Sequence, residues 1–135
     1  MGTAALLSCL LLAASTYSVP PAVLLGIMTV EGGAVGQEVG PNRNGTYDVG
    51  AMQINTIWIP ELAEHWQVDE ATAQEWVRDD GCVNINVAAW ILRGRINKTG
   101  HLVKGIAHYH SATPKYGVPY ANRVLDAIDR LSKRR

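Results

Sequence analysis

Apolar residues along the chain recur mostly at helical spacing, and few stretches alternate apolar and polar residues with the period of two that a half-buried strand shows. The spacing predicts helices over residues 20–31, 56–66, 69–78, 83–96, 102–111 and 119–131, and weaker helical patterning over 49–55. Pro20 and Pro21 suit a helix start, because proline is tolerated in a first turn. Asp69 is placed to cap a later helix. We therefore predict a mainly α fold.

Residues 1–19 carry no charge, which fits either a signal peptide or a first helix. A signal peptide requires basic residues before its apolar core, and none stands there in this sequence. The most apolar part, residues 1–14, is too short to span a bilayer as a helix. We therefore favour a first helix that belongs to the fold, and we expect no stable membrane insertion.

Turn-forming residues are frequent between residues 34 and 48, including Gly40-Pro41 and Asn44-Gly45. They predict a loop with a short irregular hairpin around residues 40–50. The sequence contains no internal repeat, low-complexity tract or long linker. We therefore expect a single domain over residues 1–135, with its core between about 9 and 131.

Composition and charge exclude several classes of protein. The chain has 135 residues, of which 47% are apolar and 18% charged, as in an ordinary globular domain. Twelve basic residues balance twelve acidic ones, so no net field attracts nucleic acid or an acidic membrane.

The two cysteines, Cys9 and Cys82, could be two buried thiols or one disulfide, and their number alone does not decide between these states.

Glu31 is the residue most suggestive of chemistry, because it shares the apolar face of its predicted helix. The residues three, four and seven positions before it are Met28, Ile27 and Leu24. Burial of a carboxylate disfavours its charged form and raises its pKa. A carboxylic acid that stays protonated near neutral pH can protonate the leaving oxygen of a glycosidic bond. The alternative is that Glu31 frays outward at the helix end and is merely solvated.

Two amides, Gln53 and Asn55, alternate with the apolar residues Met52 and Ile54. Buried amides need hydrogen-bond partners, and sugar hydroxyl and acetamido groups are suitable ones. Both amides could instead cap the local backbone. A calcium loop around Asp48 is disfavoured, because the spacing lacks the alternating carboxylates and terminal glutamate of an EF-hand.

Three motifs in order resemble those of soluble-lytic-transglycosylase-like domains. The first is Glu31-Gly-Gly, and the second is the loop 44–48 followed by Gly-Ala-Met-Gln-Ile-Asn at 50–55. Ala-His-Tyr-His-Ser at 107–111 resembles the third, and 79–85 resembles the stretch that opens the family's central helix, notably at Cys82 and Asn84.

The resemblance runs from about residue 9 to residue 124 and is closest to the small specialised members that accompany conjugation and secretion machines. It implies a lysozyme-like fold of the goose-type lysozyme and lytic transglycosylase kind. The implied substrate is the glycan strands of bacterial peptidoglycan, and components of a conjugation or type III or IV secretion apparatus are the implied partners. The implied location is the periplasm or cell envelope. We expect a monomer.

The resemblance also assigns roles to individual residues. Glu31 carries over as the catalytic acid/base. The residues implied to bind substrate or support the cleft are Met52, Gln53, Asn55, Tyr109 and Tyr120. Of these, Tyr109 is expected to orient Glu31 or stabilise the transition state, and Asn55 to support the cleft. The family often pairs a cysteine near the first helix with one before the central helix, which implies a Cys9–Cys82 disulfide.

The chain departs from the family pattern at several positions. Gly32 replaces the usual Ser after the catalytic Glu, Ala51 replaces the usual Leu, and His110 replaces the usual Asn, with the following Gly missing. His108 and His110 invite a metal interpretation, but residues two apart on a helix point in different directions and no third ligand is suggested. We therefore expect no metal.

The implied reaction uses one carboxylate, whereas ordinary glycosidases use two. Glu31 would protonate the glycosidic oxygen and then deprotonate the muramoyl C6 hydroxyl, closing a 1,6-anhydro ring without water or cofactor. Two alternatives remain. One is a hydrolytic muramidase of goose-lysozyme type with Asp48 positioning the water, and the other is an inactive glycan-binding or assembly factor.

Overall fold

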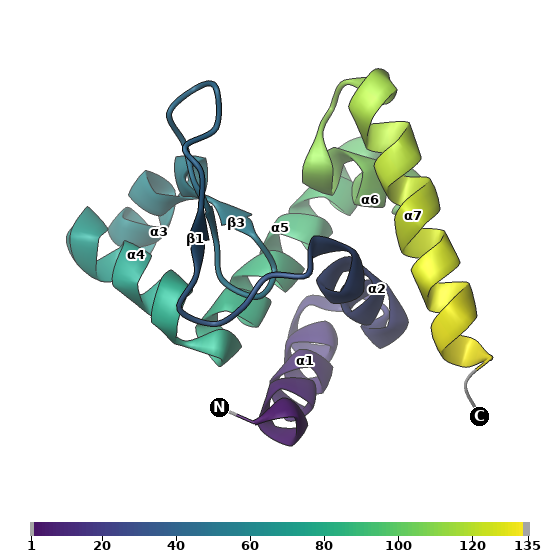
Figure 1. The fold of residues 1–135 in the computed structure, drawn as a ribbon, viewed down its shortest axis with the longest axis horizontal. Coiled ribbons are helices and arrows are strands. Elements are labelled where there is room, and N and C mark those ends of the chain that lie inside the picture. The colour runs from purple at the N-terminus through teal and green to yellow at the C-terminus, as the bar shows by residue number, and fades with distance from the viewer. Residues whose placement is uncertain (1, 134–135) are drawn as a thin grey trace.

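The computed structural model describes residues 2–133, which contain seven α-helices, one short 3-10 helix and a small sheet (Figure 1). The helices are α1 (Thr3–Tyr17), α2 (Pro21–Glu31), α3 (Ile59–Trp66), α4 (Glu70–Asp79), α5 (Gly81–Thr99), α6 (Leu102–His110) and α7 (Pro114–Ser132). The strands are β1 (Glu38–Val39), β2 (Asp48–Val49) and β3 (Ile54–Asn55), and the 3-10 helix η1 is Thr56–Trp58. The prediction of a mainly α fold is confirmed. The predicted bounds of 1–135 include Met1, Arg134 and Arg135, which lie outside the described residues.

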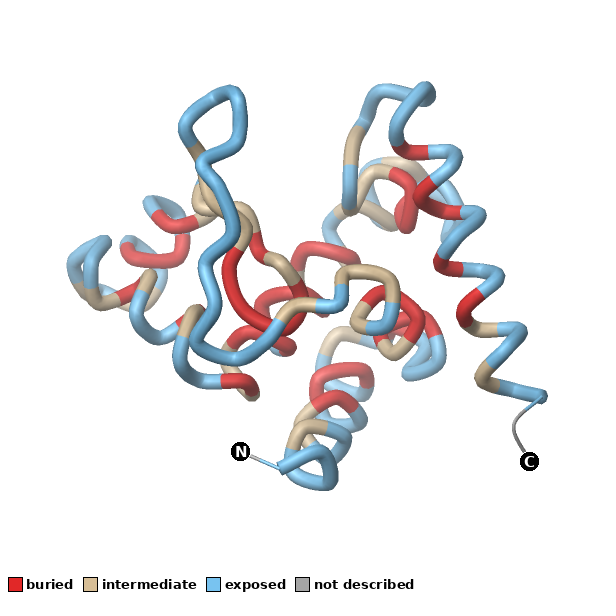
Figure 2. Tube along the Cα trace, in the orientation of Figure 1, coloured by how far each residue is buried: buried red, intermediate tan, exposed pale blue. Residues whose placement is uncertain are grey.

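Helix α5 is the central element of the fold, because α1, α4 and α6 all pack against it. Asp80 caps its start by accepting hydrogen bonds from the backbone N–H groups of Cys82 and Val83, and Gly100 ends it in a left-handed conformation. These caps extend the helix beyond the predicted range 83–96. Figure 2 shows the buried segments gathered along α5 and the elements that face it.

Helix α1 packs against α2 and α5, and its residues Leu10, Ala13 and Ala14 are buried in the core. A disulfide joins Cys9 in α1 to Cys82 at the start of α5, which confirms the implied pairing. The first helix therefore contributes to the hydrophobic core. Among the described residues, no helix has both the length and the apolarity needed to cross a membrane.

The predicted hairpin around residues 40–50 is present as the antiparallel pair β1–β2, and β3 continues the sheet in the order β1-β2-β3. The weaker helical patterning over 49–55 was misleading, because these residues form the end of β2, a tight turn and β3. Gly50 and Gln53 both have positive φ, at 73° and 51°, which a continuous α-helix does not allow. Residues distant in sequence hold this turn, as described below.

Helix α7 begins at Pro114 rather than at the predicted residue 119, so Pro119 lies inside it. A proline there removes one backbone donor. Gly117 lies so close to α6 that an added side chain would collide with the backbone oxygens of Ala107 and Ser111. The first turn of α7, which Pro119 disfavours, therefore packs closely against α6.

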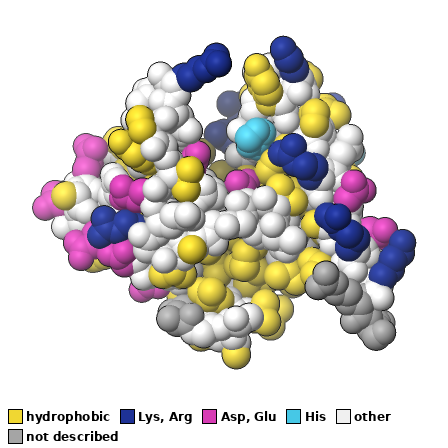
Figure 3. Space-filling model, viewed as in Figure 1, with side chains coloured by type: hydrophobic (Ala, Val, Ile, Leu, Met, Phe, Trp, Pro, Cys, Tyr) yellow, Lys and Arg dark blue, Asp and Glu magenta, His cyan; other side chains and the backbone are white. Residues whose placement is uncertain are grey.

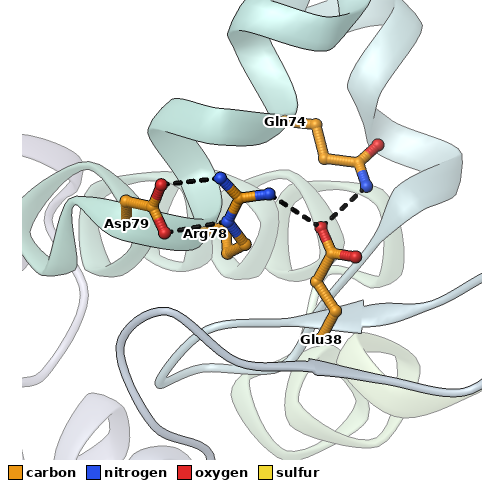
Figure 4. A network of polar contacts seen from close by, with 4 residues as sticks. All are labelled: Glu38, Gln74, Arg78 and Asp79. Carbon is orange, nitrogen blue, oxygen red and sulfur yellow. Dashed lines mark hydrogen bonds and ion pairs between the residues drawn. The ribbon is translucent and has the colours of Figure 1, made fainter.

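A polar network ties β1 to α4 on the surface (Figure 4). Arg78 forms two hydrogen bonds with Asp79, at 2.8 and 2.7 Å, and an ion pair with Glu38 at 3.6 Å. Gln74 donates a hydrogen bond to the same Glu38 carboxylate at 3.0 Å. Exposed ion pairs contribute little to stability, so we interpret the network as orienting the base of the hairpin.

Candidate active site

Glu31 is the last residue of α2, and Gly32 ends the helix in a left-handed conformation with φ of 62°. The apolar face predicted for this helix is present, since Leu24 and Ile27 are fully buried. Glu31 continues that face and is half-buried. The carboxylate therefore does not fray into bulk water.

The Glu31 carboxylate accepts a hydrogen bond from the Tyr120 hydroxyl of α7, with 2.7 Å between Oε2 and the hydroxyl oxygen. Burial is the main cause of a pKa of Glu31 raised to about 7, and the hydrogen bond from Tyr120 opposes that rise. The negative charge of Asp48 raises this pKa further, and Arg123 lowers it. Near neutral pH the group can therefore both give and take a proton.

Three rings stack beside Glu31. The Tyr109 and Tyr120 rings lie 6.4 Å apart between centroids and 17° from parallel, and His110 stacks on Tyr120 at 4.7 Å. The Tyr109 hydroxyl donates to the backbone oxygen of Met52 at 3.0 Å. Burial raises the pKa of both tyrosines, and the negative charge of Glu31 adds to the effect. Both hydroxyls therefore remain protonated hydrogen-bond donors.

The turn between β2 and β3 is held by Asn84, a fully buried residue of α5. Its Oδ1 accepts from the backbone N–H of Met52 at 2.8 Å, and its Nδ2 donates to the backbone oxygens of Val49 and Val77 at 2.9 and 3.0 Å. Gly50 has no room for a side chain because Asn84 occupies the space that a Cβ would need. Asn84 thus connects α4, α5 and the turn.

Gly33 also approaches this turn closely, since a Cβ there would collide with the backbone oxygen of Gly50. Gln53 donates from Nε2 to the same oxygen at 2.9 Å. The segment that follows Glu31 therefore lies directly against the turn that carries Gln53, which requires glycine at position 33.

A second set of amides surrounds Asp48. Asn55 donates to its Oδ1 at 3.1 Å and Asn42 to its Oδ2 at 3.3 Å. Asn55 also donates to the hydroxyl of Thr46 and accepts from the backbone N–H of Ile57. These contacts fix the strands of the hairpin beside Glu31.

These elements enclose a cleft of about 970 Å³. Figure 3 shows it as the hollow between the hairpin side and the α6–α7 side, with acidic groups at its floor and Lys and Arg side chains around it. Its lining includes Glu31, Asp48, Gln53, Asn55, Trp58, Arg95, Lys98, Tyr109, His110 and Tyr116. The combination of a protonatable carboxylic acid, amides and aromatic rings in one groove suits the binding and cleavage of a polysaccharide.

The chain matches the family model of the transglycosylase SLT domain over residues 8–117. The match covers most of the chain, including all three motifs and both cysteines. The protein belongs to this family. No curated protein matches it significantly.

Membership in the transglycosylase SLT family identifies the protein as an enzyme with lytic transglycosylase activity on peptidoglycan. The arrangement of seven helices with a small antiparallel sheet in the described residues is consistent with the lysozyme-like fold of the family. A peptidoglycan substrate together with the disulfide indicates the cell envelope as its location.

The residues predicted for the site occupy different positions around the transglycosylase cleft. Gln53, Asn55 and Tyr109 line it together with Glu31. Met52 does not, because its side chain is fully buried in the core and its backbone contacts Tyr109 and Asn84 instead. The hydrogen bond to Glu31 comes from Tyr120, whereas the Tyr109 hydroxyl is engaged with Met52.

Sequence reasoning did not assign a role to Asn84 beyond the family resemblance, and it missed the stacking of Arg95 on Trp58. A signal existed for Asn84, because it precedes the buried Ala88 and Ile91 by four and seven residues and thus lies on an apolar face.

Within the described part of the chain, no group of three or more His, Cys, Asp or Glu side chains is arranged to hold a metal ion.

The Tyr120→Phe variant is expected to shift the alkaline limb of the pH–rate profile to higher pH. The hydroxyl stabilises the charged form of Glu31, so its loss raises the pKa of Glu31 above about 7 and keeps the acid protonated at higher pH. The maximal rate should fall roughly tenfold, because the carboxyl group loses an orienting hydrogen bond. Tyr17→Phe in α1 serves as a matched control. An unchanged limb in Tyr120→Phe would contradict the assignment of Tyr120 as a positioning residue.

Proposed function

We propose that Glu31 is the single acid/base of a non-hydrolytic cleavage of the β-1,4 bond between N-acetylmuramic acid and N-acetylglucosamine. The observation that carries the proposal is a half-buried carboxyl group with a pKa of about 7 that faces the cleft and accepts a hydrogen bond from Tyr120. A group that acts first as acid and then as base works best when its pKa lies near the working pH.

In the first step the Glu31 carboxyl proton passes to the glycosidic oxygen, and the bond from that oxygen to muramoyl C1 breaks. The acetamido group of the same sugar stabilises the electron-deficient C1. In the second step the Glu31 carboxylate takes the proton of the muramoyl C6 hydroxyl, whose oxygen forms a bond to C1. Glu31 is protonated again, and the products are a 1,6-anhydromuramoyl end and a free N-acetylglucosamine C4 hydroxyl.

The amides and rings around Glu31 have supporting roles in this proposal. Gln53 lines the cleft next to the acid and offers amide groups to the sugar acetamido and hydroxyl groups. Tyr120 orients Glu31, and Tyr109 fixes the backbone at Met52. Asn55 supports the wall of the cleft through Asp48.

A hydrolytic muramidase would need a second group to activate water. Asp48 is close enough to raise the pKa of Glu31, but each of its carboxylate oxygens already accepts a hydrogen bond, from Asn55 and Asn42. A carboxylate engaged in this way has fewer free acceptor positions with which to bind and orient a water. This favours the lytic outcome.

Mass analysis of the fragments that the purified protein releases from peptidoglycan tests the proposal. We expect muropeptides with 1,6-anhydro ends, which lack the one water that hydrolysis adds. Reducing ends as the main product would favour the muramidase instead, and a protein that binds the wall without releasing fragments would indicate the inactive glycan-binding factor.

We further propose that the enzyme is a monomeric periplasmic protein that opens the wall locally for a conjugation or secretion apparatus. Support for this setting comes from the sequence alone, which most resembles the small specialised transglycosylases that accompany such machines. Deletion of the gene in its host should then reduce DNA transfer or protein secretion without a general defect in wall turnover.

A further inference from the structure

One wall of the cleft, the face of α5 that lines it, carries positive charge that the chemistry assigned to Glu31 does not use. Arg95 and Lys98 lie on the face of α5 that lines the cleft, four and seven residues after Ile91, which lines it too. Arg43 lines the cleft from the hairpin loop. Three cations from two separate elements thus face the groove that would hold the substrate.

Arg95 is held in place by an aromatic ring rather than by an acidic partner. Its guanidinium carbon lies 5.0 Å from the centroid of the Trp58 ring, and Trp90 packs edge-on against that ring with 5.5 Å between centroids. Stacking on an aromatic face fixes the plane of a guanidinium group without consuming its in-plane N–H donors.

Arg95 forms no ion pair within the described part of the chain. The ion pairs found there join Arg78 to Glu38 and Asp79, and Lys133 to Asp129. The Arg95 Nε is buried without a hydrogen-bond partner. Proteins rarely retain a buried donor without a partner. Because no internal ion pair explains the fixed Arg95 guanidinium group, we consider a role in binding a ligand.

We propose that Arg95, assisted by Lys98, binds a free carboxylate on the peptide attached to the muramoyl lactyl group of the substrate. The inference rests on the proposed function, since it presumes a peptidoglycan strand in the cleft. The sugar hydroxyl and acetamido groups are neutral and pair well with amides, whereas the peptide stems carry the carboxylates that match a planar guanidinium fork. The enzyme would then prefer glycan strands that keep their peptides with free carboxylates.

The test compares two forms of one substrate, namely soluble peptide-bearing glycan strands before and after amidation of their carboxylates with carbodiimide and excess ammonium. The wild type is expected to cleave the unmodified strands with a kcat/KM about tenfold higher, mainly through KM, as expected for one charge-assisted hydrogen-bonded pair. Arg95→Met removes the charge but keeps an unbranched chain on Trp58. In this variant the ratio of kcat/KM for unmodified strands to kcat/KM for amidated strands should fall to nearly one.

Lys98→Gln should reduce the preference about threefold, because an exposed lysine binds more weakly than a fixed arginine. Lys104→Gln on α6 removes an exposed positive charge outside the cleft lining and serves as the matched control, which should keep the wild-type preference. Circular dichroism of each variant confirms that it is folded.

Two outcomes would overturn the inference. In one, the wild type cleaves both forms of the strands equally well. In the other, Arg95→Met loses the same factor on both forms, which would mean that Arg95 contacts the sugars. A wild type that cleaves neither form would instead contradict the proposed function, so the two failures are distinguishable.

Discussion

Glu31→Gln is expected to reduce the rate of peptidoglycan cleavage by about 10³-fold or more while the fold stays intact. Glutamine has the size of glutamate and can still accept the hydrogen bond from Tyr120. It has no acidic proton to give to the glycosidic oxygen and cannot later accept one from the C6 hydroxyl. General acid–base groups contribute about 10²–10⁴-fold, and here one group serves both steps. Release of muropeptides from purified sacculi measures the effect.

The same substitution should also stabilise the protein at alkaline pH. The pKa of Glu31 is raised on folding, so the native state binds more protons than the unfolded state and loses stability as the pH rises toward about 7. Glutamine removes this loss. The gain in the free energy of unfolding is expected to be about 3 kcal/mol at most above pH 7, since one pKa unit corresponds to about 1.4 kcal/mol.

Glu64→Gln in α3 is the matched control, because Glu64 is exposed and does not line the cleft. It should keep both the activity and the pH dependence of stability. If Glu31→Gln cleaved peptidoglycan at the wild-type rate, Glu31 would not be the acid/base. A fully inactive variant with greater stability at pH 8 would show that the active site is maintained at a cost in stability.

The sequence placed Glu31 on an apolar helix face because that signal is local, and the motifs of the family resemblance implied its catalytic role. A helix repeats every 3.6 residues, so the positions of Leu24, Ile27 and Glu31 within one helix reveal that they share a face. The same reasoning located the other long helices. The sequence could not tell that Tyr120, 89 residues away, would donate the hydrogen bond to Glu31, because that contact depends on how α7 packs against α2.

The turn at residues 50–53 could not be predicted from local pattern, because its conformation depends on a distant residue. Met52 and Ile54 suit a helix or a strand equally well by their polarity, and Gly50 is merely permissive. The turn is selected by hydrogen bonds with Asn84, which accepts from the N–H of Met52 and donates to the oxygen of Val49. The family resemblance implied that Met52 lines the cleft, whereas the turn directs its side chain into the core.

The cationic wall of the cleft was likewise beyond sequence reasoning. Arg95 and Lys98 lie near the end of α5, where the charged residues are all basic, as is common in the last turns of a helix. Only the approach of Trp58 from η1 distinguishes Arg95 from a solvated arginine. Contacts between elements far apart in sequence therefore define the substrate groove, whereas local periodicity places Glu31 on an apolar helix face and the family resemblance implies its role as the acid.

Asn84→Ala is expected to reduce the free energy of unfolding by about 5 kcal/mol. The substitution leaves three buried backbone groups without their partner, namely the N–H of Met52 and the oxygens of Val49 and Val77. Each unsatisfied buried group costs about 1–3 kcal/mol. Because domains are stable by only about 5–15 kcal/mol, the variant is close to unfolding at ordinary temperature. Urea titration followed by circular dichroism measures the change.

Asn86→Ala provides the matched control, because it is the same substitution two residues later on α5 at an exposed position. It should change the free energy of unfolding by less than about 0.5 kcal/mol. Where the Asn84→Ala variant remains folded, it should also cleave peptidoglycan more slowly, because the turn that carries Gln53 loses its anchor beside Gly33. Wild-type stability in Asn84→Ala would mean that water replaces the amide at all three backbone groups. In that case the cleft owes its shape to the glycines at positions 33 and 50 rather than to Asn84.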